Sequence, residues 1–370
     1  MSAHRLDALV VGDPANMNWL TGFDAWSFYV PQILVVTHDR PPYWIGRAMD
    51  ADAVCLTTYL PEASILPYPE VLVQRDDVHP AEAMAARICD LGLGRARLGY
   101  ESDCYFFSPK CLALLERGLP EAQFIDADRL VNWARVVKSP AEIQLMEQAA
   151  RLAEAAHLRA LEVIAPGLRQ CDLMAEILAA QTRGTPEFGG DQTALSPLIL
   201  AGEAAATAHP LWSDAPFEAG QTVALELGGT RRRYNAGLAR TLQLGPIPPL
   251  LRDTAAAVEE GLNAVLKTLR AGVAAGQVHA AWQRVLDRHG LEKESRIGYS
   301  IGVGYAPDWG EHTVSLRAGE AILLEAGMCL HVMLGMWMAD WGMELSETVL
   351  VTEQGVRCLT DFPRAVQSVT

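Results

Sequence analysis

Residues 223–241 read Val-Ala-Leu-Glu-Leu-Gly-Gly-Thr-Arg-Arg-Arg-Tyr-Asn-Ala-Gly-Leu-Ala-Arg-Thr and predict a β-hairpin. Two apolar strands, near 221–227 and 236–243, flank a run of three arginines that is typical of a solvated turn. Glu226 is the charged residue of the first strand. A carboxylate that faces an apolar core is costly unless it is paired. We therefore expect Glu226 either to point into a pocket or to pair with a structural partner such as Arg240.

This hairpin resembles the metal-binding hairpin of the aminopeptidase P/prolidase/creatinase superfamily with its metal ligands removed. In the metallopeptidases of that superfamily, an Asp-x-Gly and a later Asp-x-x-Arg-Thr supply the two aspartates that bind the dinuclear metal. Here Glu226 stands at the first aspartate position and Gly237 at the second. A glycine has no side chain with which to bind a metal.

Three further ligand positions have also changed. The family's histidine, in Gly-His-x-x-Gly, is replaced by Tyr299, and its first glutamate, in Gly-Met-x-x-x-x-Glu-Pro-Gly, by Met333. Its last glutamate falls near Ser346, one residue before Glu347. Hard divalent metals need several carboxylate or imidazole ligands that converge on one point. The resemblance therefore implies a site without metal, and no cofactor is expected.

The resemblance extends over nearly the whole chain and points to one branch, the ectoine hydrolases, with creatinase as the nearest other metal-free relative. Two places depart from the ectoine-type pattern: the residues around His209, and Leu334, which stands where a proline is usual. The segments that carry the resemblance are 13–22, 26–32, 46–50, 188–191, 296–302, 308–312 and 346–348.

The order of the predicted elements favours an α+β chain of two domains. We interpret residues 1–134 as a creatinase-like N-terminal α/β domain and residues 135–370 as a pita-bread catalytic domain. A capping box of Ser139 and Glu142 begins a long helix, and His157 on its apolar stripe is interpreted as a core histidine. In the second domain we expect further helices at 170–182, 251–270 and 277–289 and strands near 193–200, 221–227, 236–243, 297–304, 321–333 and 343–351.

Composition limits the classes of partner. The net charge of −15 argues against nucleic acid and anionic membranes, which attract clustered basic residues. No apolar run in the 370 residues approaches the roughly 20 residues needed to span a bilayer. The seven cysteines contain no Cys-x-x-Cys pair and are expected to be free thiols. The first residues lead directly into a strand and not into a signal peptide, so we expect a cytoplasmic protein.

His209 and Glu226 are the predicted catalytic residues. His209 stands where the family places a pocket histidine that shuttles protons, and an imidazole pKa of about 6.5 suits that role. A loop histidine with a structural hydrogen bond is the alternative. Glu226 could bind a cationic amidinium or attack its carbon as a nucleophile.

The substrate-binding candidates follow from the substrate that the resemblance implies. Ectoine is a zwitterionic cyclic amidine, so its site needs acidic groups for the amidinium, a guanidinium for the carboxylate and aromatic walls. By resemblance to creatinase, Arg47 is expected to reach the substrate of a neighbouring subunit, which predicts a homodimer whose active site is completed by the partner's N-terminal domain. The predicted substrate-binding residues are Arg47, Trp26, Phe28, Tyr29, Tyr299, Trp309, Glu311, His331, Glu344 and Glu347.

These features predict a metal-independent hydrolase that opens the ring of ectoine to an N-acetyl-2,4-diaminobutyrate, a step of osmolyte degradation. Covalent attack by Glu226 and direct attack by water both remain open. The alternatives are a creatinase-like amidinohydrolase, an Xaa-Pro dipeptidase, which the lost ligands disfavour, and a non-catalytic pseudo-peptidase that binds an osmolyte.

Overall fold

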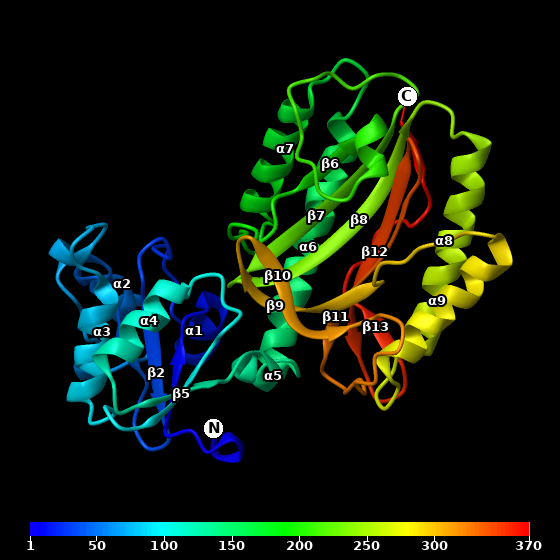
Figure 1. Cartoon of the computed structure of the whole chain (residues 1–370). Helices are drawn as coiled ribbons and strands as arrows, with labels where there is room; N and C mark the ends of the chain where they lie inside the picture. The colour runs from blue at the N-terminus through cyan, green and yellow to red at the C-terminus, as the bar shows by residue number, and fades with distance from the viewer. Residues whose placement is uncertain (370) are drawn as a thin grey trace. The chain divides into compact units, whose positions relative to one another are not determined.

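The computed structural model describes residues 1–369, which form two compact units (Figure 1). The first unit is Met1–Arg135 and the second begins at Val136. Each unit combines a β-sheet with α-helices. Within residues 1–369 there is no helix with the length and apolar character that a membrane crossing requires.

The first unit is a sheet with helices on both faces. Its strands are β1 (Ala8–Val11), β2 (Ile33–Thr37), β3 (Tyr43–Ile45), β4 (Arg97–Tyr100) and β5 (Gln123–Asp126), in the order β3-β2-β1-β4-β5. Its helices are α1 (Pro14–Thr21), α2 (Ala51–Thr57), α3 (Pro80–Asp90), α4 (Pro109–Gly118) and α5 (Leu130–Ala134), with short 3₁₀ helices η1 (Ser2–His4), η2 (Ala48–Asp50), η3 (Glu62–Ser64) and η4 (Glu70–Leu72). Because successive strand residues face opposite sides, Val10 packs in a core with α3 and α4, and Leu9 and Val11 pack in another with α1 and α2.

The second unit is built on a nine-stranded sheet. Its strands are β6 (Leu198–Ala201), β7 (Thr222–Arg231), β8 (Tyr234–Leu244), β9 (Gly298–Tyr305), β10 (Asp308–Ser315), β11 (Cys329–Trp337), β12 (Gly342–Val351), β13 (Val356–Cys358) and β14 (Gln367–Val369). They run in the order β13-β12-β11-β9-β8-β7-β6, with β10 paired to β9 and β14 to β8. The predicted hairpin is confirmed as β7 and β8, which pair from Thr222 with Gln243 to Arg231 with Tyr234.

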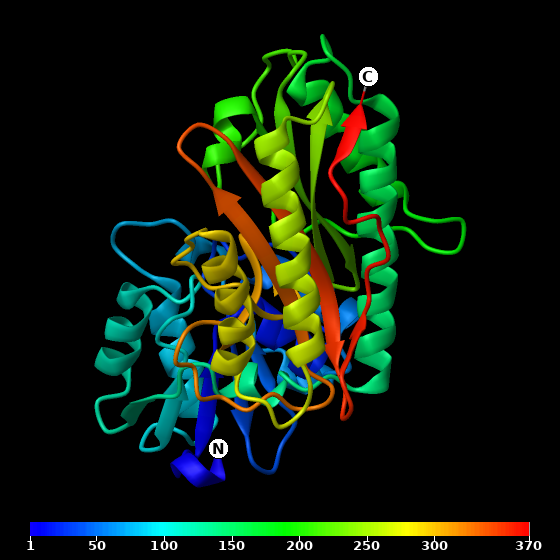
Figure 2. The ribbon, with the colours of Figure 1, turned by 90° about the vertical axis from the view of Figure 1, so that its right-hand side faces the viewer.

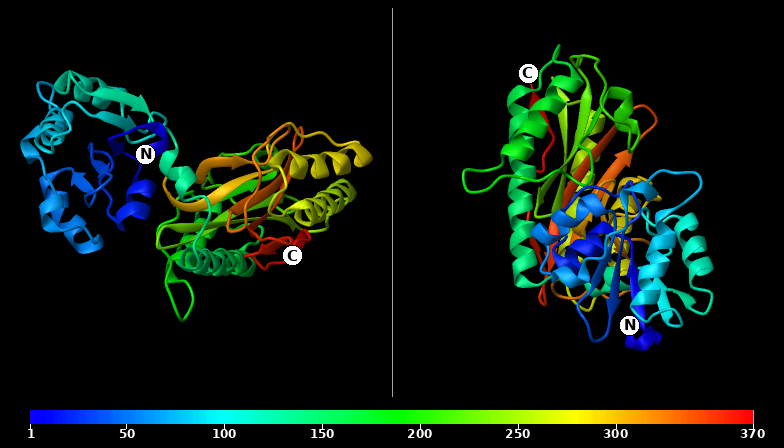
Figure 3. Two further views of the ribbon diagram at one scale, coloured as in Figure 1. Left: turned by 90° about the horizontal axis from the view of Figure 1, so that it is seen from below. Right: turned by 90° about the vertical axis from the view of Figure 1, so that its left-hand side faces the viewer.

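The α-helices of the second unit pack on one face of this sheet. They are α6 (Pro140–Val163), α7 (Gln170–Arg183), α8 (Pro249–Thr268) and α9 (Ala275–His289). Leu225 and Leu242 pack in one core with α6 and α7, and Val332 and Leu345 pack in another with α8 and α9. Figure 2 shows α8 lying along the strands, and Figure 3 shows the long α6 from two further directions. The alternate residues of these strands therefore point away from the helices.

The long helix behaves as predicted. Ser139 caps α6 and Glu142 closes the capping box, its carboxylate accepting from the Ser139 backbone N–H at 2.7 Å. His157 is buried with its Nδ1 3.0 Å from the Ala153 carbonyl, and burial lowers its pKa to about 4. The interpretation of His157 as a core histidine is confirmed.

Some strand predictions for the second unit were wrong. The strand expected near 321–333 begins only at Cys329, and the one expected near 193–200 begins only at Leu198. Strands β10, β13 and β14 were not predicted. The pairing of β10 with β9 shifts register between Asp308 and Gly310 and again before Ser315, and such irregularities remove the alternation that marks a strand in sequence. The seven cysteines are free, as expected.

Candidate functional site

The face of the second unit's sheet opposite its helices is here called the site face. It carries a set of buried or partly buried polar residues: Glu226 on β7, Tyr299 on β9, His331 on β11, and Glu344 and Ser346 on β12. Along these strands they alternate with, or pair directly opposite residues that alternate with, the residues that pack against the helices, so their side chains point to the opposite face of the sheet. Glu226 is 5% exposed, and His331, Glu344 and Ser346 are at most 1% exposed. Buried polar groups need partners in the protein or in a ligand.

His331 lies at the centre of the site face. Its Nε2 is 2.8 Å from Ser346 Oγ, and its Nδ1 is 3.3 Å from the Tyr299 hydroxyl and 4.0 Å from Glu226 Oε1. The indole N–H of Trp309 donates to the same Tyr299 hydroxyl at 2.9 Å. The rings of Tyr299 and Trp309 each stand edge-on to the imidazole, with centroids 5.6 Å away. The structure thus brings together four predicted residues, Glu226, Tyr299, Trp309 and His331.

Two glycines make room for these rings. Gly237 and Gly228 pair across β8 and β7. A Cβ on Gly237 would lie 3.0 Å from His331 Nε2 and 3.0 Å from Trp309, and a Cβ on Gly228 would clash with the Trp309 ring. A side chain at Gly237, the position of a metal-binding aspartate in the family, would crowd the imidazole and the indole, which occupy that space.

Burial sets the protonation of the site face. It raises the pKa of Glu226 to about 7. It lowers the pKa of His331 to about 3, and the positive charge of Arg296 lowers that pKa further in the same direction. Burial, with the charge of Glu226, also raises the pKa of Tyr299 above its ordinary range. At neutral pH the imidazole and phenol are neutral, whereas Glu226 is close to its midpoint.

Glu344 is also on the site face, and neither carboxyl oxygen has a hydrogen-bond partner within residues 1–369. Burial, reinforced by the charge of Glu226, raises its pKa well above the ordinary value. Lys293 lies on the same side: its ammonium donates to the Gly335 carbonyl at 2.6 Å and lies 4.0 Å from the centre of the Trp337 ring. Burial lowers the pKa of Lys293 to about 8.

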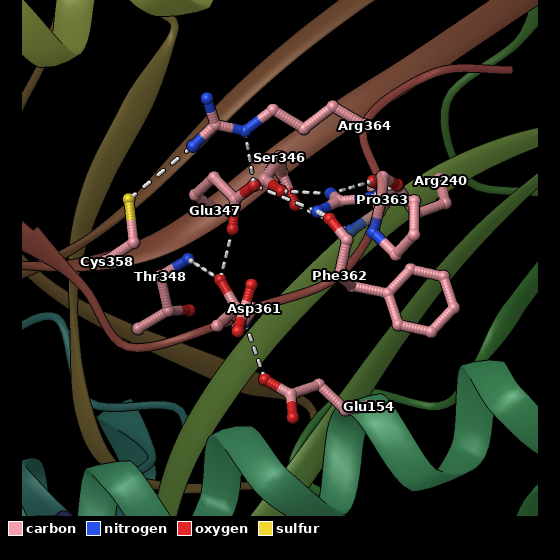
Figure 4. Close-up of polar contacts among 12 residues, drawn as sticks. Glu154, Arg240, Ser346, Glu347, Thr348, Cys358, Asp361, Phe362, Pro363 and Arg364 are labelled. Carbon is pink, nitrogen blue, oxygen red and sulfur yellow. Dashed lines mark hydrogen bonds and ion pairs between the residues drawn. The ribbon is translucent and has the colours of Figure 1, made fainter.

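Glu347 is not on the site face, contrary to its prediction as a substrate-binding residue. It pairs with Arg240 at 2.9 Å and Arg364 at 2.9 Å (Figure 4). It also accepts a hydrogen bond from Thr360. The neighbouring Ser346 faces the site, and adjacent strand residues face opposite sides. Arg240 is therefore the partner of Glu347 and not, as the alternative had it, of Glu226.

Glu311 is held in a separate buried ion pair. Its carboxylate binds the ammonium of Lys138, and both side chains are 1% exposed. Gly302 lies against this pair, and a Cβ there would clash with Glu311. A carboxylate with this internal cation has little need of a cationic ligand, so its predicted contact with substrate has no support in the geometry.

The remaining binding candidates lie in the first unit. Arg47 forms a two-point ion pair with Glu70, with Nε 2.6 Å from Oε2, and its Nη1 donates to the Tyr29 hydroxyl at 2.9 Å. Trp26 and Tyr29 are largely exposed. Phe28 is half-buried with its ring edge-on to Trp26. The hydrogen bond thus holds the side chains of Arg47 and Tyr29 next to each other in the first unit.

His209 lies on an exposed loop after the 3₁₀ helix η5 (Gly202–Ala206). No hydrogen bond or ion pair links it to another residue of the described chain. The structure therefore does not bring His209 to Glu226, and a structural hydrogen bond, the alternative, is also not seen within residues 1–369.

Sequence reasoning missed several neighbours of the site. Glu70 holds Arg47, Lys293 approaches Glu344, and the Arg296 guanidinium lies 4.4 Å from the Tyr299 ring centre. Of the missed neighbours of the site, only Gly228 could have been recognised from the sequence, because a glycine inside a strand often marks a point where another group packs closely against the backbone. Here that group is the Trp309 ring.

The fold family implies a metal, and the side chains present do not fit one. Glu226 is a carboxylate, but Gly237, Tyr299, Met333 and Ser346 at the other ligand positions offer neither carboxylate nor imidazole. In the described part of the chain, no group of three or more His, Cys, Asp or Glu residues could hold a metal ion. This donor set is unsuited to a divalent cation.

Comparisons with known proteins agree with this architecture. The model of metallopeptidase family M24 matches residues 144–353, and that of the creatinase/prolidase N-terminal domain matches residues 1–137. The chain is 41% identical to an ectoine hydrolase of Halomonas elongata, over 98% of this chain and 93% of that protein. It is 40% identical to an uncharacterised hydrolase/peptidase of Sinorhizobium fredii, again over 98% and 93%.

Solved structures show the same fold. A prolidase from Thermococcus sibiricus superimposes with a TM-score of 0.85 at 17% identity, over all of this chain and 96% of that one. The predicted fold class, a creatinase-like N-terminal domain followed by a pita-bread domain, is confirmed by these matches.

Proposed function

The chain belongs to metallopeptidase family M24, with that superfamily's creatinase/prolidase N-terminal domain, and from this premise we propose that it opens the cyclic amidine ring of ectoine without a metal ion. It is a hydrolase of this family. Since the ligand positions offer a metal too few donors, the water-activating role of a metal must pass to side chains or to a side-chain nucleophile.

One observation carries the proposal: Glu226 is a buried carboxylate without a fixed cation. No described residue donates a hydrogen bond to it, and the nearest basic group, His331 at 4.0 Å, is neutral. A buried, unpaired carboxylate is unfavourable until a cation binds. An amidinium, which is planar and positively charged, satisfies that need, and the 41% identical ectoine hydrolase supports this choice of cation.

Glu226 can act on the amidine carbon in two ways. It can attack that carbon and form a covalent adduct, or it can accept a proton from a water molecule that attacks instead. In both routes one water is consumed and one C–N bond of the ring breaks. In the covalent route water then attacks the former amidine carbon and the bond from that carbon to the Glu226 oxygen breaks, so in both routes the oxygen of water ends in the acetyl group of an N-acetyl-2,4-diaminobutyrate. Its pKa of about 7 suits Glu226 to exchange protons at neutral pH.

The substrate carboxylate is assigned to Arg47 of a partner subunit in a homodimer. Arg47 is already oriented by Glu70 and Tyr29, and a guanidinium held at two points can offer its remaining N–H groups to a carboxylate. Tyr29, which accepts the hydrogen bond from Arg47, and Trp26 are exposed aromatic residues of the same unit. We retain this trans arrangement, which also supplies the aromatic wall that an amidinium prefers.

The proton-carrying role of His209 remains a prediction. Its loop follows η5, which packs beside β7 and β12. The exposed imidazole has no competing partner within residues 1–369. His209→Ala should therefore lower kcat and leave ectoine binding intact if the loop delivers this side chain to the substrate, and unchanged kcat removes it from the mechanism.

Product analysis tests the function. The purified protein is incubated with ectoine, 5-hydroxyectoine, creatine and an Xaa-Pro dipeptide, and products are identified by mass spectrometry. We expect ectoine to gain one water and yield an N-acetyl-2,4-diaminobutyrate. Turnover of creatine alone would favour the amidinohydrolase, and turnover of the dipeptide alone would overturn the proposal. Binding of ectoine without any product would identify a pseudo-enzyme.

A further inference from the structure

Glu344 is a buried carboxyl group that neither the fold nor the proposed role of Glu226 uses. It is 1% exposed, and both its oxygens lack a hydrogen-bond partner in the described chain. The indole N–H of Trp337 is near enough to influence this carboxyl but makes no hydrogen bond of normal geometry with it. A polar group buried in this way is expensive, so its retention on the site face needs an explanation.

The groups around Glu344 keep it protonated. Glu226 on β7 contributes a negative charge, and burial excludes water, so both disfavour the carboxylate. Among residues 1–369, Lys293 is the cation that acts on it, but its ammonium is bonded to the Gly335 carbonyl, opposite Glu344 in the strand pairing. His331 on the neighbouring β11 and Tyr299 on β9 are neutral. These surroundings thus favour the neutral, protonated form of Glu344.

Opening of an amidine ring requires such an acid, because the nitrogen that leaves the carbon must take up a proton. The other proton carriers of the site face are already engaged. Both nitrogens of His331 face hydroxyl groups, and the Tyr299 hydroxyl lies between His331 and the Trp309 N–H. Within this face of the described unit, Glu344 has a proton and no internal acceptor for it.

Resting on the proposed function, we propose that Glu344 is a second catalytic residue, the acid that protonates the departing ring nitrogen, while Glu226 serves the amidine carbon. In the water-attack form, water loses one proton to Glu226 as its oxygen bonds to the carbon. Glu344 then protonates the ring nitrogen and the C–N bond breaks. The protonated carbonyl returns a proton to Glu344, and Glu226 gives its proton to the free amine, so both carboxyl groups are restored.

The test compares Glu344→Gln, which keeps the shape but removes the acidic proton, with Glu294→Gln, an exposed substitution next to Lys293 in the same loop. We expect Glu344→Gln to lower kcat on ectoine by about 10²–10⁴-fold, with calorimetric affinity for ectoine close to that of the wild type. Glu294→Gln should match the wild type. Unchanged kcat in Glu344→Gln overturns the proposal.

A second measurement needs no turnover. Infrared spectroscopy of the ligand-free protein at neutral pH should show a protonated carboxyl band from Glu344 that is missing in the Glu344→Gln spectrum and present in that of Glu294→Gln. Glu101 and Glu226, whose pKa values burial raises to about 8 and about 7, add bands that are the same in both variants. If Glu344→Gln leaves the protonated carboxyl absorption unchanged, Glu344 is not protonated and the proposal is wrong. If the wild type does not hydrolyse ectoine, the proposed function fails while the band still decides the state of Glu344. Should Glu344→Gln not fold, Glu344→Asp must keep both the band and part of kcat.

Discussion

Strand β12 carries two glutamates with opposite surroundings. Glu347, on the helix side of the sheet, is bound by Arg240, Arg364 and Thr360. Glu344, on the site face, has no partner for either oxygen among residues 1–369, and Glu226 across the same face has no cation. Buried charges are tolerated in a fold when they are paired. The difference separates carboxyl groups that hold the protein together from those that await a ligand.

The largest effect on activity is expected from Glu226→Gln, which changes an unpaired carboxyl group of the site face. This change keeps the shape but removes the charge that the amidinium would pair with. We expect kcat to fall by about 10²–10⁴-fold and ectoine affinity to fall with it. Steady-state kinetics and calorimetry measure the two effects. Near-wild-type affinity and kcat would place the substrate elsewhere.

On the paired side, Glu347→Gln should act on stability. It leaves the buried guanidinium of Arg240 without its full countercharge, at a cost of about 3–5 kcal/mol of unfolding free energy. Glu344→Gln, on the same strand, removes a group with no partner and should lose no stability. Urea unfolding of the two variants compares the faces directly. Equal losses of unfolding free energy in Glu347→Gln and Glu344→Gln would show that the two glutamates do not differ in their structural role.

Glu226 on the site face should contribute to the pH dependence of stability. The pKa of Glu226 is raised from 4.5 to about 7 in the folded protein, so folding favours its protonated form. The resulting loss of folding stability is absent below about pH 4.5, grows as the pH rises, and is complete above about pH 7. At about 1.4 kcal/mol per pKa unit, stability should decline by about 2–3 kcal/mol over this range.

Unfolding in urea between pH 5 and pH 8 measures this decline. Glu226→Gln cannot titrate and should show a flatter profile than the wild type. A difference between the two proteins that is independent of pH would mean that Glu226 is charged throughout and has an unrecognised partner.

The smallest effect is expected at the floor of the site. In Gly237→Ala the added methyl would lie 3.0 Å from the His331 imidazole and from Trp309, which should cost about 1–3 kcal/mol of stability. Gly355→Ala is the matched control, because nothing lies within 4 Å of its Cβ position. Thermal unfolding of both variants checks the prediction. A neutral Gly237→Ala would show that the rings are free to move aside.

Local patterns predicted much of this architecture. The hairpin around Glu226 and Gly237 and the capped helix at Ser139 depend on residues close in the chain, and both are confirmed. The neutralisation of Glu347 depends on Arg240 and Arg364, which are brought to it only by the fold. The exposed position of His209 likewise follows from the course of a loop, which no periodic pattern specifies.

The central claim is that unpaired carboxyl groups on the site face do the work that a metal does elsewhere in the family. It is tested most directly by measuring ectoine hydrolysis after dialysis against EDTA, with the metal content of the same sample determined by elemental analysis. The account predicts full activity with far less than one metal ion per chain. Activity that disappears on dialysis and returns with stoichiometric manganese, cobalt or zinc would contradict it.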